Sequence, residues 1–219
     1  MKKKIIALVA LLACFTMGAS AQVYVGGSLG FTSSKLSTGG HDQDGTSFKL
    51  LPEFGYQLDQ DISIGLQIGY SHGYAAFGSI TVNDFKALMN TGISTMMDIN
   101  EDDYKLNSFT FAPYVRYNFA HLGKIDLFFE GSVGYSNVKS DDTPNMNGKA
   151  TGSESKLDVI EIALRPGVSF NLNNNISLIA KLGSLGFMQA KEKESDMKLT
   201  RFGLDMDSYN LLFGLNFHF

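Results

Sequence analysis

The C-terminal segment, residues 209–219, limits the possible fold more than any other part of the chain. Its odd positions are apolar or aromatic, and its even positions are mostly polar or small, up to the terminal Phe219. A period of two is that of a β-strand with one apolar face. An exposed aromatic edge strand would aggregate in water, so this strand needs paired neighbours and an apolar solvent on its outer face. The pattern therefore predicts a transmembrane β-barrel.

The same alternation recurs along the chain in further segments. They are residues 22–32, 48–58, 62–71, 109–119, 125–135, 160–172 and 176–183. Short turns at 59–61, 121–124 and 173–175 alternate with longer polar connections at about 39–45, 76–103, 139–156 and 190–206. An even strand number with short periplasmic turns and longer outward loops is typical of bacterial outer-membrane barrels. We therefore predict an all-β fold, an eight-stranded antiparallel up-and-down transmembrane β-barrel with short periplasmic turns and long extracellular loops.

The N-terminal segment, residues 1–21, has the features of a cleaved signal peptide. Three lysines follow Met1, residues 5–12 are apolar, and Ala19-Ser20-Ala21 is a small-residue cleavage site. The apolar run is shorter than the about 20 residues of a membrane-spanning helix. We expect the signal peptide to be removed, residues 22–219 to form the barrel domain, and both ends of the mature chain to lie in the periplasm.

Charge and cysteine content exclude several classes of function. Removing the three lysines of the leader from 18 basic residues leaves 15, against 22 acidic residues, a net charge of −7. Such a chain lacks the basic surface of a nucleic-acid-binding protein. Cys14, the only cysteine, leaves with the leader, so the mature chain has no disulfide or thiol chemistry. The alternative is that residues 11–14 act as a lipobox and Cys14 is lipidated.

Charged residues occupy the face of the strands that would point into the barrel. They are Lys49, Glu53, Arg116, Glu130, Glu161, Arg165 and Lys181. A soluble lipocalin-type barrel would bury these charges in an apolar cup at high cost, whereas a polar lumen is normal for a membrane barrel. Eight strands leave a lumen just wide enough for side chains to fill. We predict that these charges form a network that plugs the lumen, with a narrow gated pore as the alternative.

With these features, residues 22–219 resemble the small eight-stranded outer-membrane barrels of Gram-negative bacteria, the group of OmpX and the OmpA transmembrane domain. Gly214, Phe217 and Phe219 match the assembly signal of that group, although Leu212 stands where a polar residue is usual. The resemblance implies insertion by the barrel-assembly machinery, contact with outer-membrane lipid and lipopolysaccharide, a monomeric state and no cofactor. The end of the chain at Phe219, with no peptidoglycan-binding domain after it, favours the shorter OmpX-like architecture.

Catalytic and metal sites receive little support from the sequence. Only His72, of the four histidines, lies near the outer rim where lipid chemistry would occur, and its neighbour Ser71 points to the opposite face. Asp98, Asn100 and Asp102 have the spacing of a calcium loop, but Asp103 replaces its turn glycine and Phe109 its bidentate glutamate. We therefore predict no catalytic residue and no metal site.

The longest connection, residues 76–103, is the expected contact surface. Its apolar residues Phe85, Leu88, Met89, Ile93, Met96 and Met97 have spacings compatible with one helical face. Such a face would dock an unidentified extracellular partner, lie on the membrane interface, cap the barrel mouth, or pack within the loop itself. We therefore predict a non-enzymatic outer-membrane protein with a role in envelope integrity and in surface contact or adhesion. A narrow gated pore is the second hypothesis and a lipid-modifying enzyme the third.

Overall fold

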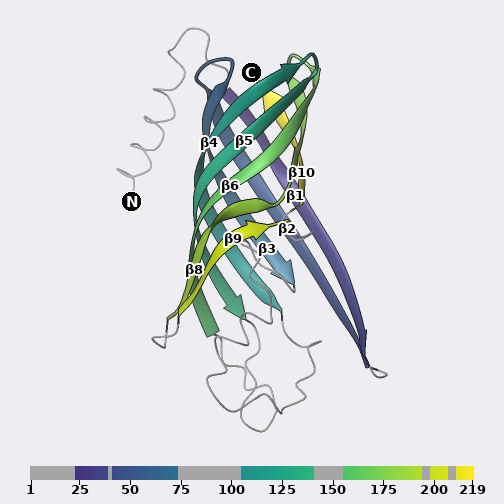
Figure 1. Cartoon of the computed structure of the whole chain (residues 1–219), viewed down its shortest axis with the longest axis vertical. Helices are drawn as coiled ribbons and strands as arrows, with labels where there is room; N and C mark the ends of the chain where they lie inside the picture. Colours follow the sequence, from purple (N-terminus) through teal and green to yellow (C-terminus); the bar gives the residue numbers. More distant parts are fainter. Residues whose placement is uncertain (1–22, 39–40, 74–104, 141–154, 194–197, 207–210) are drawn as a thin grey trace, which may run out of the picture.

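A single antiparallel sheet is wound into a barrel with short turns at one end and longer connections at the other (Figure 1). The computed structural model describes residues 23–38, 41–73, 105–140, 155–193, 198–206 and 211–219. The strand segments in this part of the chain are β1 (Val23–Thr38), β2 (His41–Gln57), β3 (Ile62–Gly73), β4 (Leu106–Leu122), β5 (Ile125–Ser140), β6 (Ser155–Asn173), β7 (Ile176–Lys181), β8 (Ser184–Glu192), β9 (Lys198–Asp205) and β10 (Leu212–His218). None of the described residues forms a helix long and apolar enough to cross a membrane.

These segments make up the predicted eight strands. β7 and β8 pair one after the other with β6, so they are two halves of one strand, interrupted at Gly183 with its positive φ of 58°. β10 pairs with β7 and β9 pairs with β8, so they are the two halves of the closing strand. Pairing of β1 with β10 and of β5 with β6 completes the ring. The prediction of a closed eight-stranded antiparallel barrel is confirmed.

The register fixes the width of the barrel. From Leu29, the ladder through β2, β3, β4 and β5 reaches Asp158 on β6. In the other direction, through β10 and β7, the ladder from Leu29 reaches Val168 on the same strand. The two paths end at Asp158 and Val168, which are ten residues apart on β6. A stagger of ten residues in a barrel of eight strands corresponds to a strand tilt of about 40° and a barrel radius of about 8 Å. Such a lumen holds side chains and little else.

Side chains alternate between the lumen and the outside, as the sequence predicts. Along β4, residues of even number are buried and those of odd number are exposed over most of the strand. The exposed residues include Phe109, Phe111, Val115 and Tyr117. Large apolar side chains are exposed in this way around the whole barrel wall. This arrangement is unfavourable in water and is that of a lipid-facing surface.

The three short turns are built from residues with local turn chemistry. The Asp59 side chain accepts hydrogen bonds from the backbone N–H groups of Asp61 (2.8 Å) and Ile62 (2.7 Å) between β2 and β3. Gly123 supplies a positive φ of 66° between β4 and β5. Asn173 accepts a hydrogen bond from the Asn175 backbone (2.9 Å) between β6 and β7. We call this end of the barrel the short-turn end and the opposite end the long-connection end.

The predictions for two of the four longer connections are wrong. The β1–β2 ladder continues to the pair Thr38–His41, so most of the predicted loop 39–45 is strand. β8 extends to Glu192 and β9 covers 198–205, within the predicted loop 190–206. Polar, glycine-containing sequence suggested loops here, but strands can pair through their backbones regardless of side-chain polarity. The leader, the helical face at 85–97 and the calcium-like residues Asp98, Asn100 and Asp102 lie outside the described residues.

Candidate functional site

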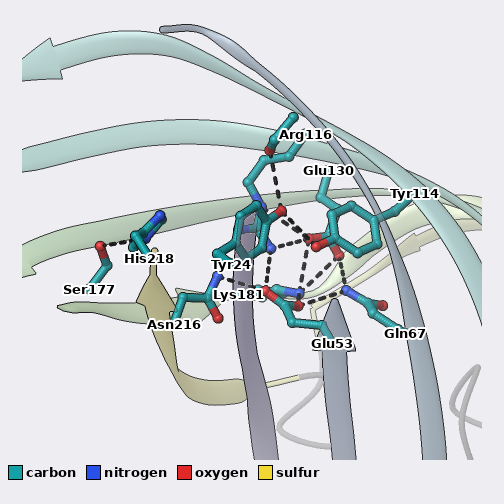
Figure 2. Close-up of polar contacts among 11 residues, drawn as sticks. Tyr24, Glu53, Gln67, Tyr114, Arg116, Glu130, Ser177, Lys181, Asn216 and His218 are labelled. Carbon is teal, nitrogen blue, oxygen red and sulfur yellow. Dashed lines mark hydrogen bonds and ion pairs between the residues drawn. The ribbon is translucent and has the colours of Figure 1, made fainter. Parts of the chain in front are cut away.

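A cluster of charged and amide side chains crosses the middle of the lumen (Figure 2). We call it the central cluster; its members are Glu53, Gln67, Arg116, Glu130, Lys181 and Asn216. They come from β2, β3, β4, β5, β7 and β10 respectively, so six strand segments of the wall contribute one side chain each. Glu53, Glu130 and Lys181 have no exposed surface. Because these positions alternate with lipid-facing ones, the strand period alone directs every member inward.

Two carboxylates and two cations pair crosswise at the centre of this cluster. Arg116 Nη2 lies 2.9 Å from Glu53 Oε1 and 2.7 Å from Glu130 Oε2. Lys181 Nζ lies 3.0 Å from Glu53 Oε2 and 2.9 Å from Glu130 Oε2. Each cation therefore contacts both carboxylates, and the formal charge of the four groups is zero. Pairing of this kind makes buried charge tolerable away from water.

Amide side chains add further hydrogen bonds to the same carboxylates. Gln67 donates to Glu53 Oε2 (3.1 Å) and Glu130 Oε1 (2.8 Å), and Asn216 donates to Glu53 Oε1 (2.8 Å). The carbonyl oxygen of Asn216 is buried without a hydrogen-bond partner. With that exception, the described buried side-chain atoms of the cluster are satisfied, which makes it a rigid polar layer.

Aromatic rings enclose Arg116. Its guanidinium carbon lies 4.7 Å from the centroid of Phe128, 5.3 Å from that of Tyr114 and 5.7 Å from that of Tyr24. Each ring stands opposite a glycine on the neighbouring strand: the pairs are Tyr24–Gly55, Tyr114–Gly65 and Phe128–Gly167. A Cβ atom at any of these glycines would collide with the ring. The glycines thus leave the space in which the rings hold the guanidinium.

The seven charges predicted to form one network do not all meet in one place. Glu53, Arg116, Glu130 and Lys181 meet in the central cluster, as described above. Glu161 and Arg165 form a separate pair at 2.8 Å, nearer the long-connection end, and Arg165 also donates to Ser132 (2.7 Å). Lys49 is buried and lies close enough to Glu161 and Arg165 to interact electrostatically with both.

Sequence reasoning missed the neutral members of the site. Four uncharged residues also occupy strand positions that the alternation predicts to face the lumen: Gln67, Asn216, Tyr24 and Tyr114. The alternation could therefore have identified them, but the candidates were selected by charge alone. The Tyr24 and Tyr114 hydroxyls are hydrogen-bonded to each other at 2.7 Å. That contact joins β1 to β4 across the lumen, and no local sequence signal reports it.

Two cavities lie in or beside the described part of the barrel. A cavity of about 330 Å³ opens toward the short-turn end and is lined by Arg116, Asp126, Asn171, Ser177 and His218 among others. A second, of about 510 Å³, lies beside β8 and β9 and is lined by Glu161, Met188, Arg201 and Asp205 among others. Arg116 and Asn216 of the central cluster line the smaller cavity, whereas the larger one includes the outward Phe202 and Leu204 in its lining.

The smaller cavity contains a contact between a serine and a histidine. Ser177 Oγ lies 3.2 Å from His218 Nε2 (Figure 2). Ser177 also donates to Asn171 Oδ1 at 2.7 Å. The Asn171 amide nitrogen donates to Asp126 (2.6 Å), which fixes the orientation of that amide. The serine proton therefore points away from the imidazole, which must donate to Ser177 rather than accept from it.

Two further histidines, His72 and His121, are hydrogen-bonded to polar side chains. His72 Nδ1 lies 2.7 Å from Asn107 Oδ1. His121, at the short-turn end, contacts Asp61 through Nε2 (2.9 Å) and Asp126 through Nδ1 (2.7 Å). These two hydrogen bonds, first that to Asp61 and then that to Asp126, raise the pKa of His121. Among the described residues, no group of histidine, cysteine, aspartate and glutamate side chains has the arrangement of a metal site.

The closing strand carries the three residues predicted as an assembly signal. Gly214 stands opposite Ser28 of β1, where a Cβ atom would meet the Gly27 carbonyl. Phe217 and Phe219 are exposed on the outer face. Backbone bonds from Phe219 N to Val23 O (2.9 Å) and from His218 N to Asn175 O (2.8 Å) place the chain end at the short-turn end.

The chain is similar to known outer-membrane proteins. A family model described as outer membrane protein beta-barrel domain matches residues 6–219. None of the curated protein sequences matches significantly. Similar solved structures include Neisserial surface protein A (14% identity, 91% of this chain and 96% of that chain, TM-score 0.44). A major outer membrane protein from Thermus thermophilus is 16% identical (91% and 100% covered, TM-score 0.45). Ail, the attachment invasion locus protein of Yersinia pestis, is 11% identical (91% and 98% covered, TM-score 0.39).

Proposed function

Since the chain belongs to the outer membrane protein β-barrel domain family, we propose that it is a closed, non-enzymatic scaffold of the outer membrane. In this proposal, both ends of the mature chain lie in the periplasm and the long connections face the outside. The barrel strengthens the envelope, and residues of the connections make surface contacts. The orientation is supported by the position of Phe219 at the short-turn end, because outer-membrane barrels have their short turns in the periplasm.

The observation that carries this proposal is the central cluster. Its two carboxylates and two cations are fully paired, buried from both ends of the barrel and held by two amides. A conducting path needs water-accessible polar groups, whereas these groups are satisfied by one another. The cluster therefore supports a sealed barrel rather than an open one.

The role of the connections rests on their position. The connections at 74–105 and 141–154 leave the barrel at the same end, opposite the chain terminus. Exposed connections on a rigid barrel are the usual place for binding residues, because the scaffold holds them while their sequence varies. We assign surface contact with an extracellular partner to these connections.

A narrow gated pore is the second candidate, because a cavity of about 330 Å³ reaches Arg116 and Asn216 of the central cluster from the short-turn end. Planar-bilayer recording of the refolded protein separates the two proposals. We expect no discrete openings for the unmodified protein. Lys181→Ala, which shortens a side chain in the seal, should produce openings and thus act as the positive control. Regular openings of the unmodified protein would overturn the sealed-scaffold proposal.

The non-enzymatic part of the proposal is supported by the hydrogen bonds of Ser177. A nucleophilic serine must give its proton to a neighbouring base. Here the Ser177 proton goes to Asn171, and the imidazole of His218 acts as a donor. Lipid analysis of cells with and without the protein is the test, and we expect identical lipid A and phospholipid profiles. A lipid species that depends on the protein and is lost in Ser177→Ala would contradict this part of the proposal.

A further inference from the structure

The ring of backbone pairing is incomplete toward the long-connection end. The pairing of β1 with the closing strand ends at Leu29 and Phe213, although β1 continues to Thr38. β9, the other half of the closing strand, pairs with β8, and none of the described residues pairs with its second edge. In Figure 1, β9 and the outer half of β1 diverge toward opposite sides of the barrel. We call this break in the wall, between residues 30–38 of β1 and β9, the lateral opening.

An excess of residues in the closing strand accounts for the break. β7 and β10 are paired at Lys181 and Leu212, and β8 and β9 are paired at Ser184 and Asp205. Between these two pairs the chain advances by three residues on one side and by seven on the other. The difference of four residues offsets β9 by about 13 Å along the strand direction. β9 is therefore not a simple continuation of β10 alongside β1.

The lateral opening lies at a level where the wall is apolar. Phe202 of β9 is in the same row of the sheet as Ile162 and Val133, which face outward. Apart from Phe219 at the chain end, the most exposed large apolar side chains of the described residues are Phe202 (78%), Phe31 (72%) and Leu204 (67%). All three lie on β1 or β9. A missing neighbouring strand explains their exposure, because the neighbours on both sides normally shield a wall side chain.

The cavity of about 510 Å³ reaches through this opening, because both faces of β9 line it. Arg201 faces inward with its ladder partner Met188, which is buried, whereas Phe202 and Leu204 face outward. A cavity that touches both faces of one strand must extend around an edge of that strand. β8 covers one edge of β9, so the cavity extends around the unpaired one.

The inner side of β9 has room for a ligand. None of the eight residues of β9 is buried, on either face. A Cβ atom at Gly203, which lines the cavity, would meet no other atom within 4 Å. A volume of about 510 Å³ is within the range of small-molecule sites.

The chemistry of the lining changes from polar to apolar across the width of β9. Glu161, Ser184, Arg201 and Asp205 contribute polar groups on the inner side, whereas the outer side is aromatic and aliphatic. Open strand edges at membrane depth are tolerated only where protein or a polar cavity satisfies their backbone groups. An occupant of the opening therefore needs hydrogen-bonding groups inside and a hydrocarbon part outside. Two carboxylates and one guanidinium in the lining disfavour an anionic group on that occupant.

We propose that the lateral opening binds a small amphipathic molecule with one hydrocarbon chain and an uncharged, hydroxyl-bearing head. The head lies in the cavity beside Gly203, and the chain passes between β1 and β9 to the outer surface of the wall. The inference goes beyond the sealed scaffold and does not depend on it, because no member of the central cluster lines this cavity.

Photolabelling of the full chain, refolded in phosphatidylcholine vesicles, tests the proposal. The probe is a monoacylglycerol with a diazirine in its acyl chain, and labelled residues are identified by mass spectrometry after proteolysis. We expect the label to concentrate on β8 and β9 and to be displaced by unlabelled monoacylglycerol. The alkyl sulfate of the same chain length should displace it about tenfold less well, because burial of an anion beside Glu161 and Asp205 is unfavourable.

Gly203→Phe fills the cavity and is the decisive variant. Its ring enters space that is open in the unmodified protein, so the variant should fold and the labelling of β9 should fall about tenfold. The electrophoretic mobility of unheated samples reports folding, and Gly203→Leu provides the same test with a smaller side chain. Gly131→Phe is the matched control. Gly131 lies in the row of Leu204, three strands away, and a Cβ atom there has its nearest neighbour at 4.0 Å, so labelling of β9 should not change.

Three outcomes would each overturn the proposal. The first is a label spread evenly around the wall, as ordinary contact with the bilayer would give. The second is unchanged labelling of β9 in the folded Gly203 variants. The third is a crosslink between the β9 edges of two copies of the chain, which would show strand pairing between molecules in place of ligand binding. Channel openings in planar bilayers would refute the sealed scaffold and leave these results unaffected.

Discussion

Replacing Glu130 by glutamine gives the most direct test of the central cluster. The substitution keeps the size of the side chain but removes one of two carboxylates that Arg116 and Lys181 share. The cluster then has an uncompensated positive charge in a lumen where these groups have almost no exposed surface. Breaking a buried pair by removing one partner costs about 3–5 kcal/mol. Against a typical stability of about 5–15 kcal/mol, we expect a large fall in the free energy of unfolding.

A double-mutant cycle shows whether this cost comes from charge compensation. Lys181→Met alone leaves two carboxylates with one guanidinium, whereas Glu130→Gln with Lys181→Met leaves Glu53 and Arg116 as a neutral pair at 2.9 Å. We expect the double variant to be more stable than the sum of the two single costs predicts, by about 1–3 kcal/mol. Glu161→Gln is the comparison variant: Glu161 and its partner Arg165 are 16% and 12% exposed and lie outside the central cluster, so the cost should be smaller, about 1–3 kcal/mol.

Urea unfolding of protein in lipid vesicles measures these values. The chain has no tryptophan, so far-ultraviolet circular dichroism and the electrophoretic mobility of unheated samples report the folded fraction. A Glu130→Gln variant whose free energy of unfolding lies within about 0.5 kcal/mol of the unmodified protein would refute the role of the cluster in stability, as would strictly additive costs in the cycle.

Three further predictions concern other parts of the barrel. Gly55→Ala places a methyl group against the Tyr24 ring and should lower the free energy of unfolding by about 1–3 kcal/mol, whereas Gly203→Ala meets no atom within 4 Å and should be nearly neutral in the same urea assay. Because the pKa of His121 is raised by Asp61 and Asp126, its contribution to stability should be complete below the pKa of the unfolded chain and disappear as pH rises through the folded pKa. His121→Gln should remove this pH dependence, and an unchanged pH profile of unfolding would contradict the assignment. Deleting Phe219 removes one backbone bond to Val23, so in vitro stability should fall by only about 1 kcal/mol while the amount inserted in cells falls strongly; normal insertion would refute the assembly-signal prediction.

The wall of the barrel could be predicted from the sequence because lipid imposes a strict rule on it. Every membrane-facing position must be apolar and every second residue faces inward, so parity alone placed Phe109 outside and Arg116 inside. The rule weakens where a strand extends beyond the apolar band, because both of its faces can then be polar. For that reason the predictions missed the outer part of the β1–β2 hairpin. They also missed β9, although its outward Phe202 and Leu204 keep the alternation, because the charged residues that precede it were interpreted as part of a loop.

The candidate site was predictable as a set of residues but not as a set of contacts. Seven lumen charges were found from parity, yet only the register decides that Glu53 and Glu130 share both Arg116 and Lys181 while Glu161 pairs with Arg165. Glu53 and Lys181 are far apart in the sequence and meet across the lumen at 3.0 Å. Such a contact depends on the stagger of the whole ring, which no local segment encodes.

The sequence by itself determined the class of fold, because alternation with a period of two, short turns and an aromatic terminal strand are local properties that a lipid environment selects. Closure of the barrel determined which side chains contact one another. The ten-residue stagger sets the radius, and the radius makes side chains from opposite strands touch, as Glu53 and Lys181 do. The seal of the lumen therefore exists only in the assembled barrel, since it is made of residues that the chain brings together from different strands.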